Sequence, residues 1–217
     1  ANMNVRAATR EDVPALLEIK RRLTFTESSR GGFLLGCDEA GYVKRLHTGR
    51  IWVLSAPASF SAVTGFAITL PSEALRSSEL WALKDRVTWT AGVPSELDDV
   101  GYFDQLAVLP EVGRRLALEL AFTALWELMK ECRYVITTTV AAPVQNLAAV
   151  PLIERLGGER VGQLDEEYPD FGALTSDLWL LSSERVRRRM FDGQAPAERW
   201  VRGLIEPGGQ TRPSRNE

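Results

Sequence analysis

The stretch that decides the fold reads YFDQLAVLPEVGRRLALEL at residues 102–120 and continues as a helical pattern to Glu131. Its first part has the composition of a β-strand, and Pro110 ends that strand because proline cannot donate a backbone hydrogen bond to a neighbouring strand. Polar residues then recur every fourth position from Glu119 to Glu131, while apolar residues cover the rest of the helix circumference. We therefore predict a strand, a tight loop and a helix that is buried on most sides.

The junction between this strand and helix has the features of an anion site. Gly113 permits unusual backbone dihedrals, and the first turn of a helix leaves its N–H groups without partners. Arg114 and Arg115 place two cations beside the positive end of the helix dipole. These features suit a phosphate or a pyrophosphate, although strand–loop–helix units with a glycine at the junction also occur in α/β proteins that bind nothing there.

The run from Leu106 to Ala117 resembles the acyl-CoA-binding motif of the GNAT superfamily of N-acetyltransferases. In that family a strand is followed by Arg/Gln-x-x-Gly-x-Gly/Ala, whose amides hold the CoA pyrophosphate at a helix N-terminus. With one loop residue missing, Gly113 takes the place of the glycine before the basic residue, and Arg115 stands where a second glycine is usual. The resemblance implies acetyl-CoA as cosubstrate and assigns to its binding Leu106, Ala107, Val108, Gly113, Arg114, Arg115, Leu116, Ala117 and Leu118.

A second motif, Asn146-Leu-Ala-Ala-Val-Pro-Leu-Ile-Glu-Arg-Leu-Gly157, resembles the GNAT pattern Asn-x-x-Ala-x-x-x-Tyr-Glu-x-x-Gly-Phe. In the family the asparagine supports cofactor binding, and the tyrosine often protonates the departing CoA thiolate. The resemblance therefore assigns Asn146 and Ile153 to the cofactor site, but an alkyl side chain at Ile153 cannot donate a proton. Pro151 within the motif predicts a helix that starts late or bends.

The remaining segments predict alternating strands and helices. We expect a strand at 4–8 and a helix with Thr9 as its N-cap, then a helix at 38–47, where His47, the only histidine, complements the helix dipole. Residues 51–56 and 63–70 predict an antiparallel pair of strands. Residues 133–140 predict an interior strand that is parallel to the strand before Pro110, and residues 159–165 and 173–181 predict a final antiparallel pair.

The resemblance covers residues 3–181 and implies an α/β (α+β) fold. GNAT proteins have a mixed, mostly antiparallel sheet of about seven strands with flanking helices, and their central parallel pair splays apart to admit the pantetheine arm. We predict that residues 182–217 form a helical appendage that packs across this domain or onto a second subunit, and we expect a homodimer.

The connection from Pro71 to Asp99 is long for a compact domain. Leu80, Leu83, Val87 and Trp81 stand at helical spacing, which predicts a helix there. The remainder of the connection either covers an acceptor pocket or packs on the sheet edge.

Composition excludes several classes of protein. A formal charge of −3 over 217 residues gives no global positive field, so we expect no nucleic-acid partner. Cys37 and Cys132 lie far apart, so neither a metal site nor a disulfide framework is predicted. We expect no signal peptide and no membrane span, and hence a cytoplasmic location.

The chemistry of the predicted site follows from the strand before Pro110. Alternation predicts that Tyr102, Asp104, Leu106 and Val108 face the same side. In several GNAT enzymes a carboxylate on this strand takes the amine proton, and Asp104 is the nearest candidate; the alternative is a charge paired with an arginine. The amide of Val108 or Leu106 would polarise the thioester carbonyl. With an alkyl group at the tyrosine position, the thiolate takes its proton from water, from Tyr102 or from Tyr168, which we place in the last joining loop with Phe171, or leaves unprotonated.

These observations predict a GNAT-type N-acetyltransferase. It would transfer the acetyl group of acetyl-CoA to a primary amine of a small molecule or a peptide, by direct attack in a ternary complex. The alternative is a GNAT-like binding or regulatory module that holds acyl-CoA with weak turnover. Ile153 and the altered phosphate loop are the features that favour this alternative.

Overall fold

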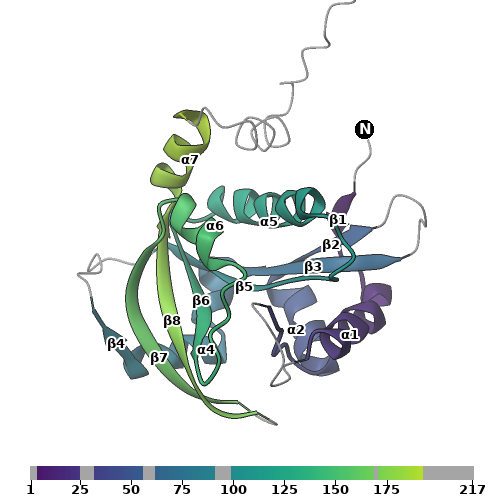
Figure 1. Cartoon of the computed structure of the whole chain (residues 1–217), viewed down its shortest axis with the longest axis horizontal. Helices are drawn as coiled ribbons and strands as arrows, with labels where there is room; N and C mark the ends of the chain where they lie inside the picture. The colour runs from purple at the N-terminus through teal and green to yellow at the C-terminus, as the bar shows by residue number, and fades with distance from the viewer. Residues whose placement is uncertain (1–3, 25–31, 56–61, 91–98, 169–170, 193–217) are drawn as a thin grey trace, which may run out of the picture.

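A mixed sheet of eight strands forms the frame of the computed structural model, which describes residues 4–24, 32–55, 62–90, 99–168 and 171–192 (Figure 1). The strand order is β1-β2-β3-β5-β6-β8-β7-β4, and every neighbouring pair is antiparallel except β5–β6. The strands are β1 (Val5–Ala7), β2 (Arg50–Ser55), β3 (Val63–Leu70), β4 (Val87–Trp89), β5 (Val100–Val108), β6 (Tyr134–Ala142), β7 (Glu159–Tyr168) and β8 (Gly172–Ser182). The predicted mixed, mostly antiparallel architecture is confirmed.

The connection that starts at Pro71 contains the predicted helical turns, and the additional strand β4 corrects only their predicted end at Val87. This connection forms α3 (Ser72–Arg76), α4 (Glu79–Ala82) and the 3₁₀ helix η2 (Leu83–Arg86) before β4. Val87, which helical spacing placed in a helix, instead pairs with Leu164 of β7 at the outer edge of the sheet. Backbone pairing with an open sheet edge overrides a weak helical pattern at this position. Residues 91–98 of the connection lie outside the described residues.

Helices cover both faces of the sheet (Figure 1). One face carries α5 (Arg114–Met129), α6 (Val150–Arg155) and α7 (Ser183–Asp192), whose apolar side chains share a buried cluster with those of the sheet. The other face carries α1 (Val13–Arg22), which follows the 3₁₀ helix η1 (Arg10–Asp12), and α2 (Glu39–Thr48), packed over β2 and β3. Among the described helices, none combines the length and apolar character that a membrane span requires.

The central helix α5 is buried along most of its length, as predicted. Its buried residues are Leu120, Ala121, Phe122, Ala124, Leu125, Leu128 and Met129. Val186 and Met190 of α7 pack in the same cluster as Leu128 and Met129, so the first helix after residue 182 lies on the core. The division at residue 182 stays a prediction, and residues 193–217 lie outside the described residues.

Local signals in the sequence place several helix starts correctly. The Thr9 N–H donates to Asp12 Oδ2 at 2.8 Å, which is half of the predicted capping interaction. The helix in the second motif starts late, at Val150, with Pro151 in its first turn, where the missing N–H costs no hydrogen bond. Both predictions are confirmed.

The parallel pair β5–β6 separates along its length. The two strands are paired only from Val100–Tyr134 to Phe103–Thr137, where the Thr137 hydroxyl also donates to the Phe103 carbonyl oxygen at 2.9 Å. Beyond that point, the last five residues of each strand have no register partner in the other strand. The predicted splay of the central pair is therefore confirmed, and it divides the pair into a paired half and an open half.

Candidate active site

A β-bulge at Asp104 marks the place where the open half of β5 begins. The register between β3 and β5 passes from Thr69–Phe103 to Ile68–Gln105, so Asp104 is an extra residue on β5. As a result, two consecutive side chains point to the α2 side of the sheet. Asp104 Oδ2 accepts a hydrogen bond from Arg45 Nε at 2.7 Å, and Gln105 Oε1 accepts one from the Tyr42 hydroxyl at 3.2 Å. Bulges re-aim side chains in this way.

The bulge overturns one prediction. Strict alternation placed Tyr102, Asp104, Leu106 and Val108 on one face of the strand. In the structure Leu106 and Val108 pack on the α5 side with Leu120, whereas Tyr102 packs on the opposite side with Leu70 and Leu75. One extra residue shifts the alternation by one position, so the strand changes face at Asp104. The Asp104 carboxyl group and the side chains of Leu106 and Val108 therefore lie on opposite faces of the same strand.

The backbone of the open half presents polar groups toward the missing partner. The Leu109 N–H donates to Thr64 O of the β3 side at 2.9 Å, and the Ala107 carbonyl oxygen lies so close to Gly65 that a Cβ there would be 2.9 Å from it. Gly65 therefore allows a close approach of the two backbones that a side chain would prevent. Because backbone groups alternate along a strand, those of Leu106 and Val108 point to the β6 side, where the ladder has ended.

The N-terminus of α5 lies next to this open backbone. Gly113 is the N-cap, no side chain caps the helix, and a Cβ placed on Gly113 would meet nothing within 4 Å. Leu116 of the first turn packs with Leu106 and Val108, which brings the helix start and the open strand together. The first-turn N–H groups and the exposed Arg114 and Arg115 therefore offer a site for an anion beside the open half of β5.

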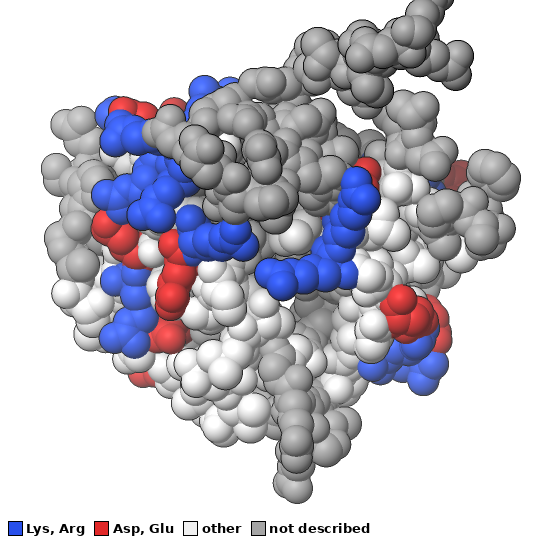
Figure 2. Space-filling model, turned by 45° about the horizontal axis from the view of Figure 1, so that its top comes forward, with Lys and Arg blue, Asp and Glu red and all other residues white. Residues whose placement is uncertain are grey.

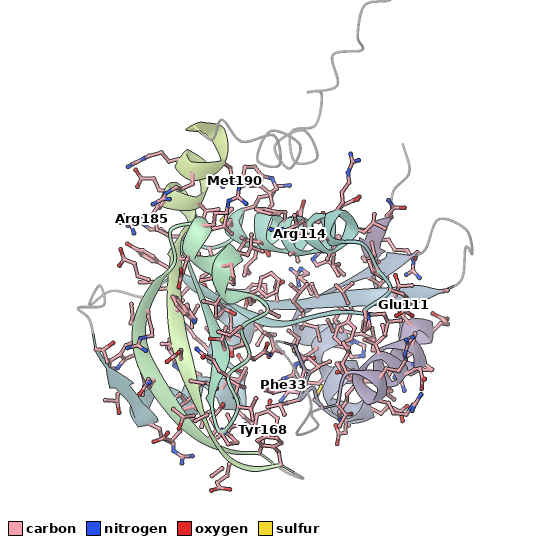
Figure 3. The ribbon with its side chains drawn as sticks, in the orientation of Figure 1. Phe33, Glu111, Arg114, Tyr168, Arg185 and Met190 are labelled. Carbon is pink, nitrogen blue, oxygen red and sulfur yellow. The ribbon has the colours of Figure 1, made fainter. Side chains whose placement is uncertain are left out.

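An ion pair holds the loop before α5 in place. Arg22 of α1 binds Glu111 with both terminal nitrogens, at 2.9 and 3.1 Å from the two carboxylate oxygens. Figure 3 labels Glu111 and Arg114 at the two ends of this turn. Figure 2, in which the α5 side comes forward, shows basic side chains interspersed with acidic ones over this face. The negative charge of Glu111 is therefore balanced next to the candidate anion site.

The carboxyl group of Asp104 is buried, with a side-chain exposure of 9%, and its ion-pair partner Arg45 is 21% exposed. Burial raises the pKa of Asp104 because the charged form loses solvation, and the Arg45 guanidinium only partly offsets this effect. The alternative that the sequence left open, a carboxylate paired with an arginine, is the arrangement present here. Its role as a base stays a prediction.

Two tyrosines, Tyr102 and Tyr168, lie in the same region as Asp104, on the side of the sheet that carries α2. The Tyr102 hydroxyl and the Thr138 hydroxyl are 2.9 Å apart, and burial raises the pKa of Tyr102. Tyr168 is the last residue of β7, paired with Gly172, so its placement in the joining loop was wrong: the strands continue beyond the predicted end. Burial and the nearby Asp104 charge raise the pKa of Tyr168 to about 12. Figure 3 labels Tyr168 near the tip of the β7–β8 pair.

Asn146 ties the loop after β6 to the segment before α2. Its Nδ2 donates to the Phe33 carbonyl oxygen at 3.0 Å, and its backbone N–H donates to Val140 O at 2.8 Å. Ile153, in contrast, is a buried core residue whose methyl group packs against Gly158. Asn146 thus bridges two segments that lie more than a hundred residues apart in sequence, a contact that the motif alone did not predict.

Sequence reasoning missed several residues of this cluster. Arg45 on α2, Tyr42 on the same helix and Glu166 on β7 come from segments far from β5 in sequence. Their spacing carries no signal, because only the tertiary fold brings them to Asp104. Within the described ranges, no group of three or more His, Cys, Asp and Glu side chains is arranged to hold a metal ion. His47 lies exposed in the last turn of α2.

Comparison with known proteins identifies the fold. No family model matches the sequence, and no curated protein matches it. Among solved structures, the chain is similar to NAA60 from Arabidopsis thaliana in complex with a bisubstrate analogue, with 18% identity, a TM-score of 0.55, and coverage of 82% of this chain and 96% of that one.

Two further structures agree. The ribosomal-protein-S18-alanine N-acetyltransferase from Escherichia coli has 17% identity and a TM-score of 0.52, with 82% of this chain and 92% of that one covered. The loading GNATL domain of CurA from Lyngbya majuscula has 14% identity and a TM-score of 0.56, with 83% and 98% covered. The chain has the GNAT acyltransferase fold.

Proposed function

We propose that this chain is an N-acetyltransferase that transfers the acetyl group of acetyl-CoA to a primary amine of a small molecule or a peptide. The observation that carries the proposal is the open half of β5, which follows the last β5–β6 pair at Phe103–Thr137 and leads to the N-terminus of α5, where no side chain caps the helix. An open strand edge receives an extended amide-bearing chain, and a helix N-terminus receives a phosphate. Pantetheine and pyrophosphate are joined in this order in CoA.

The donor fits the polar groups of this region. The pyrophosphate would accept hydrogen bonds from the first-turn N–H groups of α5 and from Arg114 and Arg115. The pantetheine amides would pair with the backbone of Leu106 and Val108. Arabidopsis thaliana NAA60 in complex with acetyl-CoA has a TM-score of 0.54 to this chain at 17% identity, which supports acetyl-CoA as the donor.

The geometry suits direct attack of an amine on the thioester. The N–H of Leu106 or Val108 would polarise the thioester carbonyl, a role that requires only backbone. The acceptor nitrogen would approach from the α2 side, where Tyr102, Asp104 and Tyr168 gather. Attack forms the C–N bond and breaks the C–S bond, and the thiolate then takes a proton. Tyr168 is the half-buried hydroxyl for this last step, because the Tyr102 hydroxyl already contacts Thr138.

A thiol-release assay tests the proposal. Acetyl-CoA is incubated with the chain and a panel of amines: spermidine, lysine, 2-phenylethylamine and a tetrapeptide with a free N-terminus. We expect acceptor-dependent release of CoA thiol for at least one of them. In parallel, CoA should raise the thermal unfolding midpoint, since a ligand that binds only the folded state stabilises it.

The second candidate is a binding module that holds acyl-CoA with weak turnover. The observation that favours it is Ile153, a buried alkyl side chain at the position where the family pattern has tyrosine. Thermal protection by CoA without thiol release on any amine would support this module over the enzyme. Absence of protection would contradict both. A cytoplasmic location and a homodimer stay predictions from the sequence.

A further inference from the structure

Glu166 of β7 is close enough to Asp104 of β5 for the charges of the two carboxyl groups to interact. Along β7, Leu164 is buried, and Glu166 and Tyr168 are half-buried, whereas the alternate residues Asp165 and Glu167 are exposed. Glu166 therefore projects from the same face of the strand as Tyr168. Its charge interacts with that of Asp104, and both Glu166 and Tyr168 influence the ionisation of Tyr102. Four titratable side chains from β5 and β7 thus share one region.

The two carboxyl groups in this region differ in their partners. Asp104 already accepts a charge-assisted hydrogen bond from Arg45 at 2.7 Å. Within the described residues, the side chain of Glu166 makes neither a hydrogen bond nor an ion pair, while its backbone pairs with Leu174 of β8. The nearby positive charge is Arg86, which stands one residue before the β4 partner of Leu164 and is exposed. A half-buried carboxylate without a partner is costly, so an incoming cation is favoured there.

We propose that Glu166, rather than Asp104, is the catalytic residue that receives the ammonium group of the acceptor and removes its proton. This inference rests on the proposed acetyltransferase function and names its acceptor class: a primary amine that arrives as a cation. Asp104 then acts as a positioning residue, because its pairing with Arg45 fixes the bulge and the direction of the open strand.

The proton balance is complete without a further reactant. The Glu166 carboxylate takes one proton from the acceptor ammonium, which leaves a neutral amine. The amine nitrogen attacks the thioester carbon, the C–N bond forms, and the C–S bond breaks. The second nitrogen proton passes to the CoA thiolate and gives the thiol. Glu166 returns its proton to solvent, so one proton is released for each acetyl group transferred.

The environment of Glu166 suits a general base. Burial raises its pKa, and the Asp104 charge adds to this effect, while Arg86 opposes it. A base whose pKa moves toward the working pH accepts a proton more readily than an ordinary surface carboxylate. The other ionisable groups that face it are Tyr102 and Tyr168, whose raised pKa values keep them protonated near neutral pH.

The test compares Glu166→Gln with Glu167→Gln and Asp104→Asn, all in the full chain. Glu167 is the matched control, because it is exposed on the opposite face of the same strand. The acceptor is the amine from the panel above with the fastest turnover. For each variant kcat/KM is measured against pH, CoA affinity is measured by calorimetry, and the unfolding midpoint is recorded.

We expect Glu166→Gln to lower kcat/KM at neutral pH by about 100-fold, a typical contribution of a general base. Its CoA affinity should stay close to that of the unchanged chain, and its unfolding midpoint at neutral pH should be equal or higher, because the variant buries no carboxylate charge. The rate of the variant should rise with pH as free amine becomes available, and Glu167→Gln should retain full activity.

Two results would overturn the inference while leaving the proposed function intact. One is a Glu166→Gln variant whose kcat/KM stays within about threefold of that of the unchanged chain. Loss of a general base would lower kcat/KM much more than this. The other is loss of the acidic limb of the pH profile in Asp104→Asn but not in Glu166→Gln. Absence of turnover by the unchanged chain with every amine would instead overturn the proposed function, and the inference with it.

Discussion

The two halves of the β5–β6 pair are built from the same two strands but are held together in different ways. In the paired half, backbone hydrogen bonds join residues 100–103 to 134–137, and Thr137 adds a side-chain bond at the last rung. In the open half, β5 is held by β3 on one side and by the packing of Leu106 and Val108 on α5. The difference teaches that this fold leaves a strand edge open by replacing backbone pairing with side-chain packing.

The helix α5 offers a matched pair of residues for breaking this comparison. Leu128 lies over Gly101 in the paired half, and Leu120 lies over Gly65 and the open half; their exposures are 1% and 0%. Leu128→Ala and Leu120→Ala should each lower the free energy of unfolding by about 2–5 kcal/mol, because each leaves a cavity. Chemical denaturation measures this change.

The two leucine variants should differ in ligand binding. Only Leu120→Ala should weaken CoA binding as well, since Leu120 shares its cluster with Leu106 and Leu116 beside the open edge. Equal loss of CoA affinity in both variants would contradict the division into two halves.

Charge reversal at the start of α5 tests the anion site of the open half. The double variant Arg114→Glu/Arg115→Glu should weaken CoA binding by about 100-fold, given about 1.5 kcal/mol for each charge-assisted bond. Both side chains are exposed, so the unfolding midpoint should change little. Isothermal calorimetry provides the affinity. Arg188→Glu on α7, an exposed arginine paired with Glu184 on the same helix, is the control and should keep full affinity.

The pH dependence of stability distinguishes Glu166, which lies near the open half of β5, from a carboxyl group in an ordinary ion pair. The folded-state pKa of Glu166 is raised above the usual pKa of a glutamate. Protonation of Glu166 therefore favours the folded state at low pH, and this contribution to stability is lost as pH rises through the folded-state pKa. Stability of the unchanged chain relative to Glu166→Gln should therefore fall between about pH 4 and neutral.

Asp12→Asn should give the opposite sign. The Arg6 guanidinium lowers the pKa of Asp12, so the stabilisation is present at neutral pH and is lost as pH falls. Asp12→Asn should therefore cost most near pH 7 and least in acid. Urea titrations at several pH values measure both trends, and parallel curves for the two variants would contradict the assigned directions.

The smallest expected effect concerns the boundary between the halves. The Tyr102 hydroxyl on the paired half of β5 contacts the hydroxyl of Thr138, the first residue of β6 beyond the ladder. Tyr102→Phe removes this bond and should cost about 1 kcal/mol of stability. Thermal unfolding measures the cost. An unchanged midpoint together with unchanged KM for acetyl-CoA would show that this contact does not hold the boundary.

Local patterns in the sequence predicted much of the architecture. The strand before Pro110, the helix after Gly113, the antiparallel β2–β3 and β7–β8 pairs and the late start of α6 follow from turn residues, periodicity and capping. The parallel neighbour of β5 follows from a strand–helix–strand order. These features depend on short-range physics, so a single sequence carries them.

Other features depend on contacts that have no local signature. The bulge at Asp104, which places Asp104 and Leu106 on opposite faces, is stabilised by Arg45 from another helix. The extension of β7 to Tyr168 and the edge strand β4 depend on pairing partners that lie far away in sequence. Alternation along one strand cannot anticipate an inserted residue, and this explains why the predicted common face was wrong.

The sequence by itself determined that a strand, a glycine-containing loop and a buried helix follow one another with two arginines at the helix start, because these features are local. The tertiary structure decided which carboxyl group is paired with an arginine and which has no ion-pair partner among the residues that the structure describes. Arg45 reaches Asp104 from α2, while β7 brings the Glu166 side chain to the same region without an ion pair to any described residue. The packing of distant segments decides this difference between the two carboxyl groups. Burial makes the charged form of the carboxyl group without an ion pair the more costly one.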